Sequence, residues 1–300
     1  MTNKLRPLLA TEVKNLKDLK LPMLASVKLD GIYALIVDGV IYSRSFKPIK
    51  NKHVQKLFGN RDLNGLVGEL VCGDVYAEDV FRQTTTATMA EDGVNDVKLY
   101  VFDDWSVGDK PYQERYQHYQ KRIKALNHGS IVALEHNMLH TIDEVITALD
   151  KEQKRNGEGI ILRLPSAKWK NGRSTPKSQE SVKLKFFEQQ EYKIVDVVER
   201  MHNANEAKVN EMGYTERSSH KDNMIPMNTF GAFVMELQDG RNFNVGSGLG
   251  LTDAVRKEIW NNRDKYIGKI ATVRQMKVGS KNGIPRLPTF VGLRDSEDMS

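Results

Sequence analysis

The stretch ASVKLDGIYALIVDGVIYS, residues 25–43, is the part of the sequence from which the fold can first be predicted. It contains two β-branched runs, 32–37 and 40–43, which only Asp38 and Gly39 separate. Both of these residue types tolerate the positive φ angles that a two-residue hairpin turn requires. We therefore expect a β-hairpin here, in a first domain that is mostly β.

A lysine stands just before this hairpin. The apolar residues 24–27 predict a strand, and Lys28, Asp30 and Gly31 form the turn that leaves it. A lysine becomes a nucleophile only when neighbouring cations or desolvation lower its pKa. Asp30 could orient the amine, and Gly31 would let the backbone approach a nucleotide closely. Taken alone, the pattern is better explained as a solvated turn lysine.

The composition of the chain narrows the class of protein. With 300 residues the chain is long enough for two domains, each with a core of its own. Its single cysteine, Cys72, excludes a disulfide framework and a zinc site of paired cysteines, which points to a reducing, intracellular setting. The chain has neither a signal-peptide pattern nor an apolar run of about 18 residues, so we expect a soluble protein.

The charges are segregated along the chain, although the formal net charge is only +6. Residues 1–56 carry 11 Lys and Arg against 4 Asp and Glu, and residues 151–190 carry 10 against 4. Residues 57–150 between them carry 8 against 16. Two basic blocks could build one cationic face, as a polyanion-binding surface requires, or the clustering could be chance.

Periodicity and turn residues predict the remaining elements of the first domain. Strands are expected at 66–71, 98–102, 159–164 and 181–186, and helices at 112–126 and 142–155.

A second domain is expected after the polar residues 188–191, which we interpret as a linker, so that the domains are 1–189 and 190–300. Five short strands and one helix fit a small OB-fold β-barrel, a common binder of nucleic acids. The polar insertion 201–229 would by composition alone be a disordered loop. The second domain is expected to contain a strand at 193–198, a hairpin at 232–245, a helix at 254–262, and strands at 270–276 and 289–293.

Several polar residues stand at the ends of predicted strands or inside them. Glu69 lies between apolar residues of a strand, where an unpaired charge is costly, and Glu158 leads into another buried-looking strand. Phe102 ends a third strand. Lys183 and Lys185 alternate, so both should point to the same face of their strand.

Each of these residues also has an ordinary explanation. Glu69 could be an edge-strand charge, Phe102 a core residue, and the two lysines a solvated strand face. Together with Lys28 they supply what nucleotidyl transfer needs: an amine, an aromatic ring for stacking, carboxylates for ribose and magnesium, and lysines for phosphate. Mg²⁺ is expected because it binds through one or two carboxylates plus substrate phosphates.

This ordered set resembles the covalent nucleotidyltransferase superfamily, and within it the ATP-dependent DNA ligases of the minimal viral type. The resemblance implies an α+β fold, with an ATP-grasp-like nucleotidyltransferase domain of antiparallel sheets and flanking helices before the OB-fold barrel. The insertion 201–229 would be a latch hairpin on that barrel. The resemblance is carried by PLL (7–9), KLDG (28–31), SRSFKPI (43–49), TT (84–85), GRST (172–175), KLK (183–185), GYTERSSHK (213–221), YIGK (266–269), GSK (279–281) and PRLPTFVGLR (285–294).

The resemblance also implies roles for individual residues. Lys28 would carry AMP covalently, with Asp30, Lys183 and Lys185 as the other catalytic residues. Glu69 would contact the ribose and Glu158 the metal, with Glu69 as a second metal ligand. The implied ATP contacts are Lys28, Arg44, Glu69, Phe102, Glu158, Lys183, Lys185, Arg286 and Arg294. The implied DNA contacts are Arg44, Lys47, Lys170, Arg173, Arg217, His220 and Lys221.

The implied activity is the sealing of nicks in duplex DNA through a lysyl-AMP and a DNA-adenylate intermediate. ATP and Mg²⁺, for which Mn²⁺ could substitute, would be the cofactors. The enzyme would be a monomer that encircles nicked duplex DNA and needs neither a protein partner nor a membrane.

The sequence departs from the family pattern at Tyr33, where many ligases have an arginine. Arg44, Lys47 or Lys170 could compensate for it. Asp103 fits its motif loosely and is left outside the expected catalytic core. A capping guanylyltransferase, an RNA ligase and a non-catalytic OB-fold binder stay open as alternatives, whereas an NAD-dependent ligase would need zinc-binding cysteines that this chain lacks.

Overall fold

The computed structural model describes residues 5–281 and 283–294, without the side chains of 277–281. The GSK motif at 279–281 is therefore described only as backbone. The chain divides into two compact units between Phe186 and Phe187, three residues before the predicted domain boundary. Among the described residues, no helix is long and apolar enough to cross a membrane.

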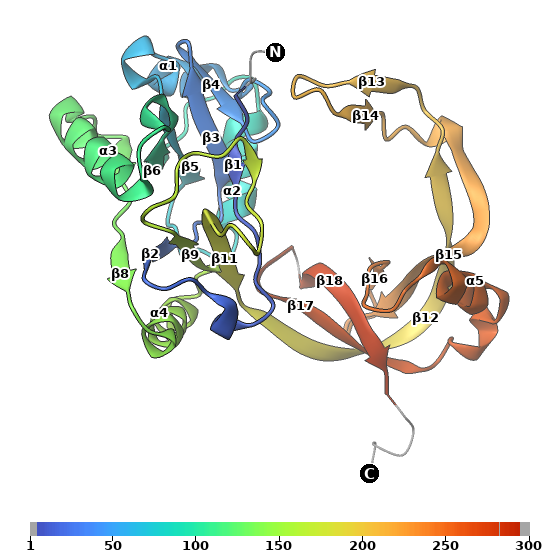
Figure 1. The fold of residues 1–300 in the computed structure, drawn as a ribbon. Coiled ribbons are helices and arrows are strands. Elements are labelled where there is room, and N and C mark those ends of the chain that lie inside the picture. The colour runs from blue at the N-terminus through green and yellow to red at the C-terminus, as the bar shows by residue number, and fades with distance from the viewer. Residues whose placement is uncertain (1–4, 282, 295–300) are drawn as a thin grey trace. The chain divides into compact units, whose positions relative to one another are not determined.

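The first unit is built on two sheets (Figure 1). The predicted hairpin forms as expected, with β3 and β4 joined at Asp38 and Gly39, whose φ angles are 51° and 80°. The first sheet has the order β4-β3-β5-β6-β7 and the second has the order β11-β9-β2-β8, while β1 and β10 form a short parallel pair. The strands are β1 (Leu8–Leu9), β2 (Met23–Val27), β3 (Ile32–Val37), β4 (Val40–Ser43), β5 (Leu66–Cys72), β6 (Val97–Asp104), β7 (Ile131–Ala133), β8 (Asn137–Leu139), β9 (Gly159–Arg163), β10 (Gly172–Arg173) and β11 (Ser181–Lys185).

In the described part of this unit, four α-helices flank the sheets. The predicted helix at 112–126 is α3 (Tyr112–Leu126), and the other predicted helix is α4 (Ile142–Lys154). The helices α1 (Lys52–Phe58) and α2 (Val80–Met89) were not predicted. Apart from the parallel β6–β7 and β1–β10 pairs, the named strands of this unit pair antiparallel, which confirms the expected α+β class with antiparallel sheets.

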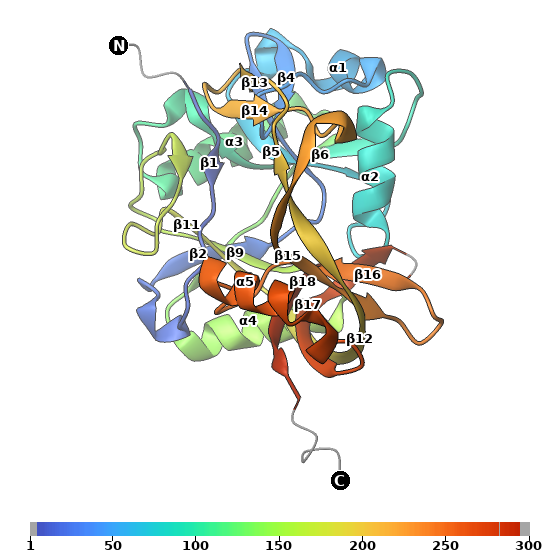
Figure 2. The same cartoon turned by 90° about the vertical axis from the view of Figure 1, so that its right-hand side faces the viewer.

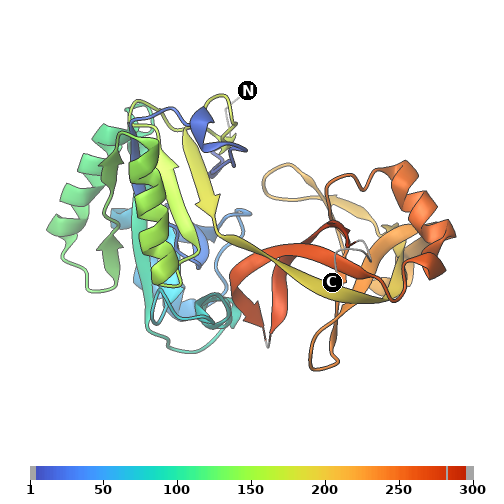
Figure 3. The ribbon, with the colours of Figure 1, turned by 90° about the horizontal axis from the view of Figure 1, so that it is seen from below.

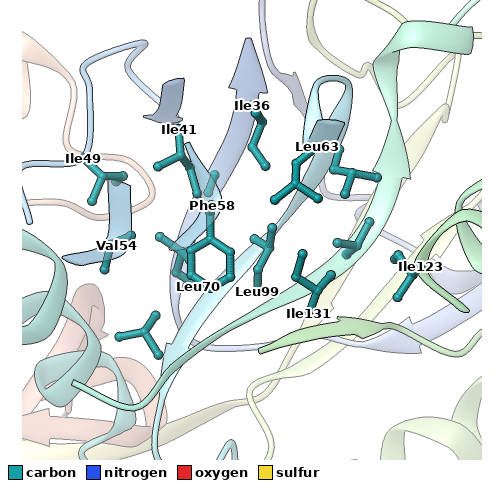
Figure 4. Close-up of a cluster of buried hydrophobic side chains, with 14 of the residues drawn as sticks. Ile36, Ile41, Ile49, Val54, Phe58, Leu63, Leu70, Leu99, Ile123 and Ile131 are labelled. Atoms are coloured by element: carbon teal, nitrogen blue, oxygen red, sulfur yellow. The ribbon is translucent and has the colours of Figure 1, made fainter. Parts of the chain in front are cut away.

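Each sheet of the first unit has its own apolar core. Ile36, Leu70 and Leu99 of the five-stranded sheet pack with residues of α1, α2 and α3, such as Phe58 (Figure 4). The four-stranded sheet packs against α4 through Val145, and α4 covers one face of it (Figure 3). Each sheet is therefore stabilised by apolar contacts with the helices that cover one of its faces.

The second unit is a five-stranded sheet with the order β16-β15-β12-β17-β18. The segment just after β16 meets β18 where the Phe290 amide donates to the Ser247 carbonyl over 2.7 Å, which closes the barrel predicted for this unit. Phe230, Phe233 and Val273 fill its core together with Ile259 of the helix. The elements are β12 (Phe187–Asn203), β13 (Ala207–Val209), β14 (Thr215–Arg217), β15 (Met224–Glu236), β16 (Asn242–Val245), α5 (Asp253–Asn261), β17 (Ile270–Lys281) and β18 (Ile284–Leu293).

Two polar segments differ from what their composition alone suggests. The expected linker 188–191 belongs to β12, because its backbone pairs with β17 while its side chains remain exposed. The insertion 201–229 is not an irregular loop, as its composition suggested. It continues the β12–β15 ribbon, whose strands run side by side, and ends in the β13–β14 hairpin that the family resemblance implied (Figure 2).

Candidate active site

Lys28 lies at the end of β2, beside the start of β9. Its backbone amide donates to the Gly159 carbonyl over 2.9 Å, which continues the β2–β9 pairing by one residue. Its amine forms an ion pair with Glu158 Oε2, and the Lys28 side chain is 19% exposed while that of Glu158 is 1% exposed. The candidate nucleophile is therefore anchored on a buried carboxylate.

Glu158 contacts a second amine as well. Its Oε1 atom lies 2.6 Å from Lys185 Nζ, so one carboxylate bridges Lys28 and Lys185. Burial works to raise the pKa of Glu158, but the two lysines outweigh it and hold the pKa below its usual value. Burial lowers the pKa of Lys185 despite this contact, and the positive charges of Lys28 and Lys183 lower it further.

A cavity of about 200 Å³ opens between the two sheets of the first unit. The side chains that line it include most of those selected from the sequence. Lys28, Lys183 and Lys185 all line the cavity, so the two strand lysines face it from the same face of β11, as predicted. The other predicted residues on its wall are Arg44, Glu69, Phe102 and Arg173.

Glu69 stands on β5 directly opposite Tyr33 of β3. Burial raises the pKa of Glu69 to about 8, Glu158 and Asp30 add to the rise, and Lys28 opposes it. Part of the Glu69 side chain still faces the cavity. Without a bound cation this carboxyl group is therefore largely protonated at neutral pH.

Phe102 has an aromatic and a cationic neighbour in the cavity wall. The centroids of the Tyr33 and Phe102 rings are 5.8 Å apart, and the Arg163 guanidinium carbon lies 4.9 Å from the Phe102 centroid. Sequence reasoning missed Arg163, which ends β9 and is 4% exposed. The signal was available, since a charged residue lay inside the buried strand predicted at 159–164, but nothing local identified its partner.

That partner is Asp103, which is fully buried. Its Oδ2 atom lies 3.2 Å from Arg163 Nη1, and its Oδ1 atom accepts from Arg115 Nε over 2.8 Å. Asp103 does not line the cavity. Its position agrees with leaving it outside the catalytic core, and its contact orients Arg163, which does line the cavity.

Two buried side-chain atoms in the cavity wall lack a hydrogen-bond partner: the Tyr33 hydroxyl and Arg163 Nε. In the part of the chain that the structure describes, no other buried side-chain nitrogen or oxygen is left unpaired. Burial raises the pKa of Tyr33 above its usual value, so its hydroxyl stays protonated at neutral pH. Unpaired buried polar atoms are rare, and two in one cavity suggest that a ligand completes their bonding.

Other predicted site residues lie away from the cavity wall. Asp30 and Lys47 are not part of it, and Lys170 contacts Glu180 and Ser178 at 3.4 and 3.3 Å instead. Of the cations considered as substitutes for the family arginine at Tyr33, only Arg44 lines the cavity, and Arg163 joins it there. The remaining predicted residues belong to the second unit: Arg217, His220, Lys221, Arg286 and Arg294.

Family profiles match both units. The profile of the ATP dependent DNA ligase domain matches residues 7–185, which is more than half of the chain. The chain belongs to the ATP-dependent DNA ligase family. The profile of the DNA ligase OB-like domain matches residues 226–294 of the ligase, within its second unit.

Solved structures agree with this assignment. The ligase is 26% identical to a Chlorella virus DNA ligase-adenylate, with a TM-score of 0.54 over 96% of this chain and 99% of that one. A second Chlorella virus DNA ligase-adenylate structure is 28% identical, with a TM-score of 0.55 over 98% and 99%. A Lig E DNA ligase shares the fold at 20% identity, with a TM-score of 0.70 over 96% and 99%. No curated protein matches this chain significantly.

The family and these structures confirm the predicted ligase activity and the use of ATP. They do not favour the capping, RNA ligase or non-catalytic alternatives.

Proposed function

We propose that this ligase seals nicks with a 5′-phosphate and a 3′-hydroxyl in duplex DNA, and that Lys28 carries the AMP between ATP and the nick. The observation that supports this proposal most directly is the position of Lys28 in the first unit. Its amine lies in the cavity wall against the buried Glu158 carboxylate, and Arg44, Lys183 and Lys185 line the same cavity.

In the first proposed step, Lys28 Nζ attacks the α-phosphorus of ATP. The P–N bond forms, the bond to the β-phosphate oxygen breaks, and pyrophosphate leaves. Before the attack the ammonium must lose a proton, and Glu158 is the base in contact with it. Arg44, Lys183 and Lys185 would neutralise the charge that the phosphates bring into the cavity.

Two further displacements would seal the nick. An oxygen of the 5′-phosphate attacks the phosphorus of lysyl-AMP, which breaks the P–N bond and restores the Lys28 amine. The 3′-hydroxyl then attacks the activated 5′-phosphorus and expels AMP, so that a phosphodiester bond replaces the phosphoanhydride. Every bond formed at phosphorus thus replaces one that breaks.

A divalent cation fits this donor set. Among the described residues no group of three or more His, Cys, Asp or Glu gathers, so the protein alone does not build a complete metal cage. Mg²⁺ usually binds through one or two carboxylates plus substrate phosphates, and Glu69 and Glu158 would provide the carboxylates. Bound there, the ion would neutralise phosphate charge. Its arrival would also favour the ionised form of Glu69.

We further propose that Phe102 stacks on the adenine, that Glu69 contacts the ribose, and that Arg286 and Arg294 of the second unit assist the ATP step. Arg217, His220 and Lys221 belong to the insertion 201–229, the latch of this proposal, and would contact DNA phosphates. Phosphate contacts carry no sequence information, so binding should be indifferent to sequence. We propose that the enzyme acts as a monomer.

Covalent labelling tests the role of Lys28. The protein is incubated with α-labelled ATP or GTP and Mg²⁺ and then denatured, and the retained label is counted. We expect label from ATP that the substitution Lys28→Ala abolishes. The matched control Lys121→Ala removes an exposed lysine of α3 and should label normally. Preferential labelling by GTP would contradict the proposal.

A second assay tests the substrate. Nicked duplexes with and without the 5′-phosphate are supplied to the adenylated protein, and sealed product is measured. Only the phosphorylated nick should be sealed. Deleting residues 203–227 should weaken binding to the nick, and an unchanged affinity would show that the latch assignment is wrong.

A further inference from the structure

The β13–β14 hairpin projects from the far end of the β12–β15 ribbon (Figure 1). Each of its strands has three residues, and all six are exposed. A two-stranded hairpin of this size has little stability of its own in water. Its conformation must therefore be held from its base, where the chain leaves β12 and returns to β15.

A buried asparagine lies at that base. Asn205 is 6% exposed, although most of its neighbours in the insertion are exposed. Its Nδ2 atom donates to the Ser218 carbonyl over 3.0 Å and to the His220 carbonyl over 2.9 Å. Asn205 lies in the segment that leaves β12, and its side chain thus binds the backbone of the segment that returns to β15.

Two more asparagines add hydrogen bonds between the segment that leaves β12 and the segment that returns to β15. Asn203 Nδ2 donates to the Ser218 carbonyl over 2.8 Å, and Asn223 Nδ2 donates to Asn205 Oδ1 over 3.2 Å. Arg217 of β14 donates to the Asn205 carbonyl. We call Asn203, Asn205 and Asn223 the asparagine clamp.

The chemistry of the clamp depends on the amide group. Between the β12–β15 ribbon and the β13–β14 hairpin, the two chain segments do not pair as regular β-strands. Their backbone carbonyls therefore need hydrogen-bond donors from side chains. An amide provides two donors and one acceptor on a short side chain, and Asn205 uses both its nitrogen and its oxygen. Neither an aspartate nor an apolar residue could make the same set of bonds.

We propose that the asparagine clamp holds the β13–β14 hairpin in its DNA-binding form before DNA arrives, with Asn205 as the main positioning residue. This inference rests on the proposed function of the latch. A segment that is already ordered loses less conformational freedom on binding, so the clamp raises the affinity for the nick without contacting the reacting atoms. Arg217 then helps to fix the hairpin base, in addition to any contact with phosphate.

The test compares Asn205→Ala with Asn244→Ala in the full chain. Asn244 is an exposed residue of β16, so its substitution is a matched change outside the clamp. Three quantities are measured: the rate of lysyl-AMP formation, the affinity of the adenylated protein for a 5′-phosphorylated nicked duplex without metal, and tryptic cleavage after Lys208, Arg217 and Lys221 without DNA.

For Asn205→Ala we expect an affinity about tenfold lower, faster tryptic cleavage at these sites, and a normal rate of lysyl-AMP formation. Asn244→Ala should leave all three unchanged. A second variant, Asn223→Ala, removes one exposed member of the clamp and leaves the barrel core intact, so it should show a smaller loss in the same direction even if Asn205→Ala fails to fold.

Unchanged affinity in both clamp variants would overturn the inference. So would a loss of affinity without faster cleavage, because Asn205 would then act on DNA directly. If the unmodified protein binds a nicked duplex no better than an intact one, the proposed function itself fails, which is a different outcome.

Discussion

At the scale of individual residues, one carboxylate, that of Glu158, balances the charges of the lysines in the candidate site. It is almost completely buried and touches both Lys28 and Lys185, so its negative charge compensates the positive charges of both lysines. Removing one partner of such a buried pair leaves the other charge uncompensated, which is costly.

Glu69 gives a pH-dependent prediction. Its pKa is about 8 in the folded protein against an ordinary value of 4.5, so between these pH values the folded state keeps a proton that the unfolded state has released. Stability from this group is therefore lost as pH rises from about 4.5 to about 8. In Glu69→Gln this loss is absent, and the melting temperature without nucleotide should exceed that of the unmodified protein by about 3 °C or more at pH 8 and by much less at pH 5.

The control for this experiment is Glu135→Gln, which changes an exposed carboxylate of the same unit. It should not alter the pH profile of melting. Equal melting temperatures of Glu69→Gln and the unmodified protein at both pH values would contradict the prediction.

Tyr33 gives a prediction that separates the free from the nucleotide-bound protein. Because its hydroxyl is buried without a partner, Tyr33→Phe should leave the melting temperature of the free protein unchanged or raise it. If ATP completes the bonding of this hydroxyl, the variant should bind ATP about tenfold more weakly and gain less thermal stability from it. Calorimetric titration and melting with and without ATP measure both effects, and an unchanged affinity would show that the hydroxyl does not contact the nucleotide.

At the scale of elements, the approach of β3 to β5 places Tyr33 beside Glu69. Gly31 makes this approach possible, because a Cβ atom there would lie 2.1 Å from the Leu70 carbonyl oxygen. That oxygen belongs to the backbone of β5 and cannot move aside as a flexible side chain would. The glycine of the KLDG motif is therefore needed for strand pairing in this chain.

The substitution Gly31→Ala should destabilise the first unit by about 2 kcal/mol or more, because the clash with Leu70 forces the two strands apart. It should also reduce lysyl-AMP formation. Denaturant unfolding measures the first effect. The control Gly129→Ala adds a Cβ atom where no heavy atom lies within 4 Å, and it should change stability by less than about 0.5 kcal/mol. Similar costs for the two variants would refute this explanation.

At the scale of the whole molecule, the predicted partner is a polyanion and the chain carries a net charge of +6. Arg44 and Arg173 lie in the cavity wall of the first unit, and Arg217 and Lys221 lie in the insertion of the second. Both units thus offer cations for the proposed contacts with DNA.

Affinity for nicked DNA should therefore fall steeply with salt. A protein that neutralises six phosphates loses about 10³-fold in affinity between 50 and 200 mM salt. Anisotropy titrations with a labelled nicked duplex measure the slope of log affinity against log salt concentration. Charge-reducing variants of the insertion should flatten this slope, and a slope near zero in the unmodified protein would exclude phosphate-dominated binding.

Helices and strands were predictable from the sequence where residues close together in the chain determine them. The β3–β4 hairpin follows from its two-residue turn, and α3 has the predicted bounds. Helix α2 was not predictable in this way, because four of its residues are threonines, whose β-branched side chains lower helix propensity, and because a tertiary contact helps to hold it. In that tertiary contact Thr84 Oγ1 accepts from the Cys72 amide of β5 over 2.9 Å, whereas the bond from Thr88 Oγ1 to the Thr84 carbonyl, over 2.8 Å, lies within the helix.

The sequence by itself determined the family, the two-unit architecture and the residue types of the candidate site, because these depend on short motifs and local periodicity. Only the tertiary structure decided which of those residues share a cavity, that Asp103 orients Arg163 from another sheet, and that polar residues of the insertion form a clamp. These features depend on contacts between distant segments, as with Asp103 and Arg163. Local sequence carries little information on such pairings, since any buried carboxylate and guanidinium could in principle meet.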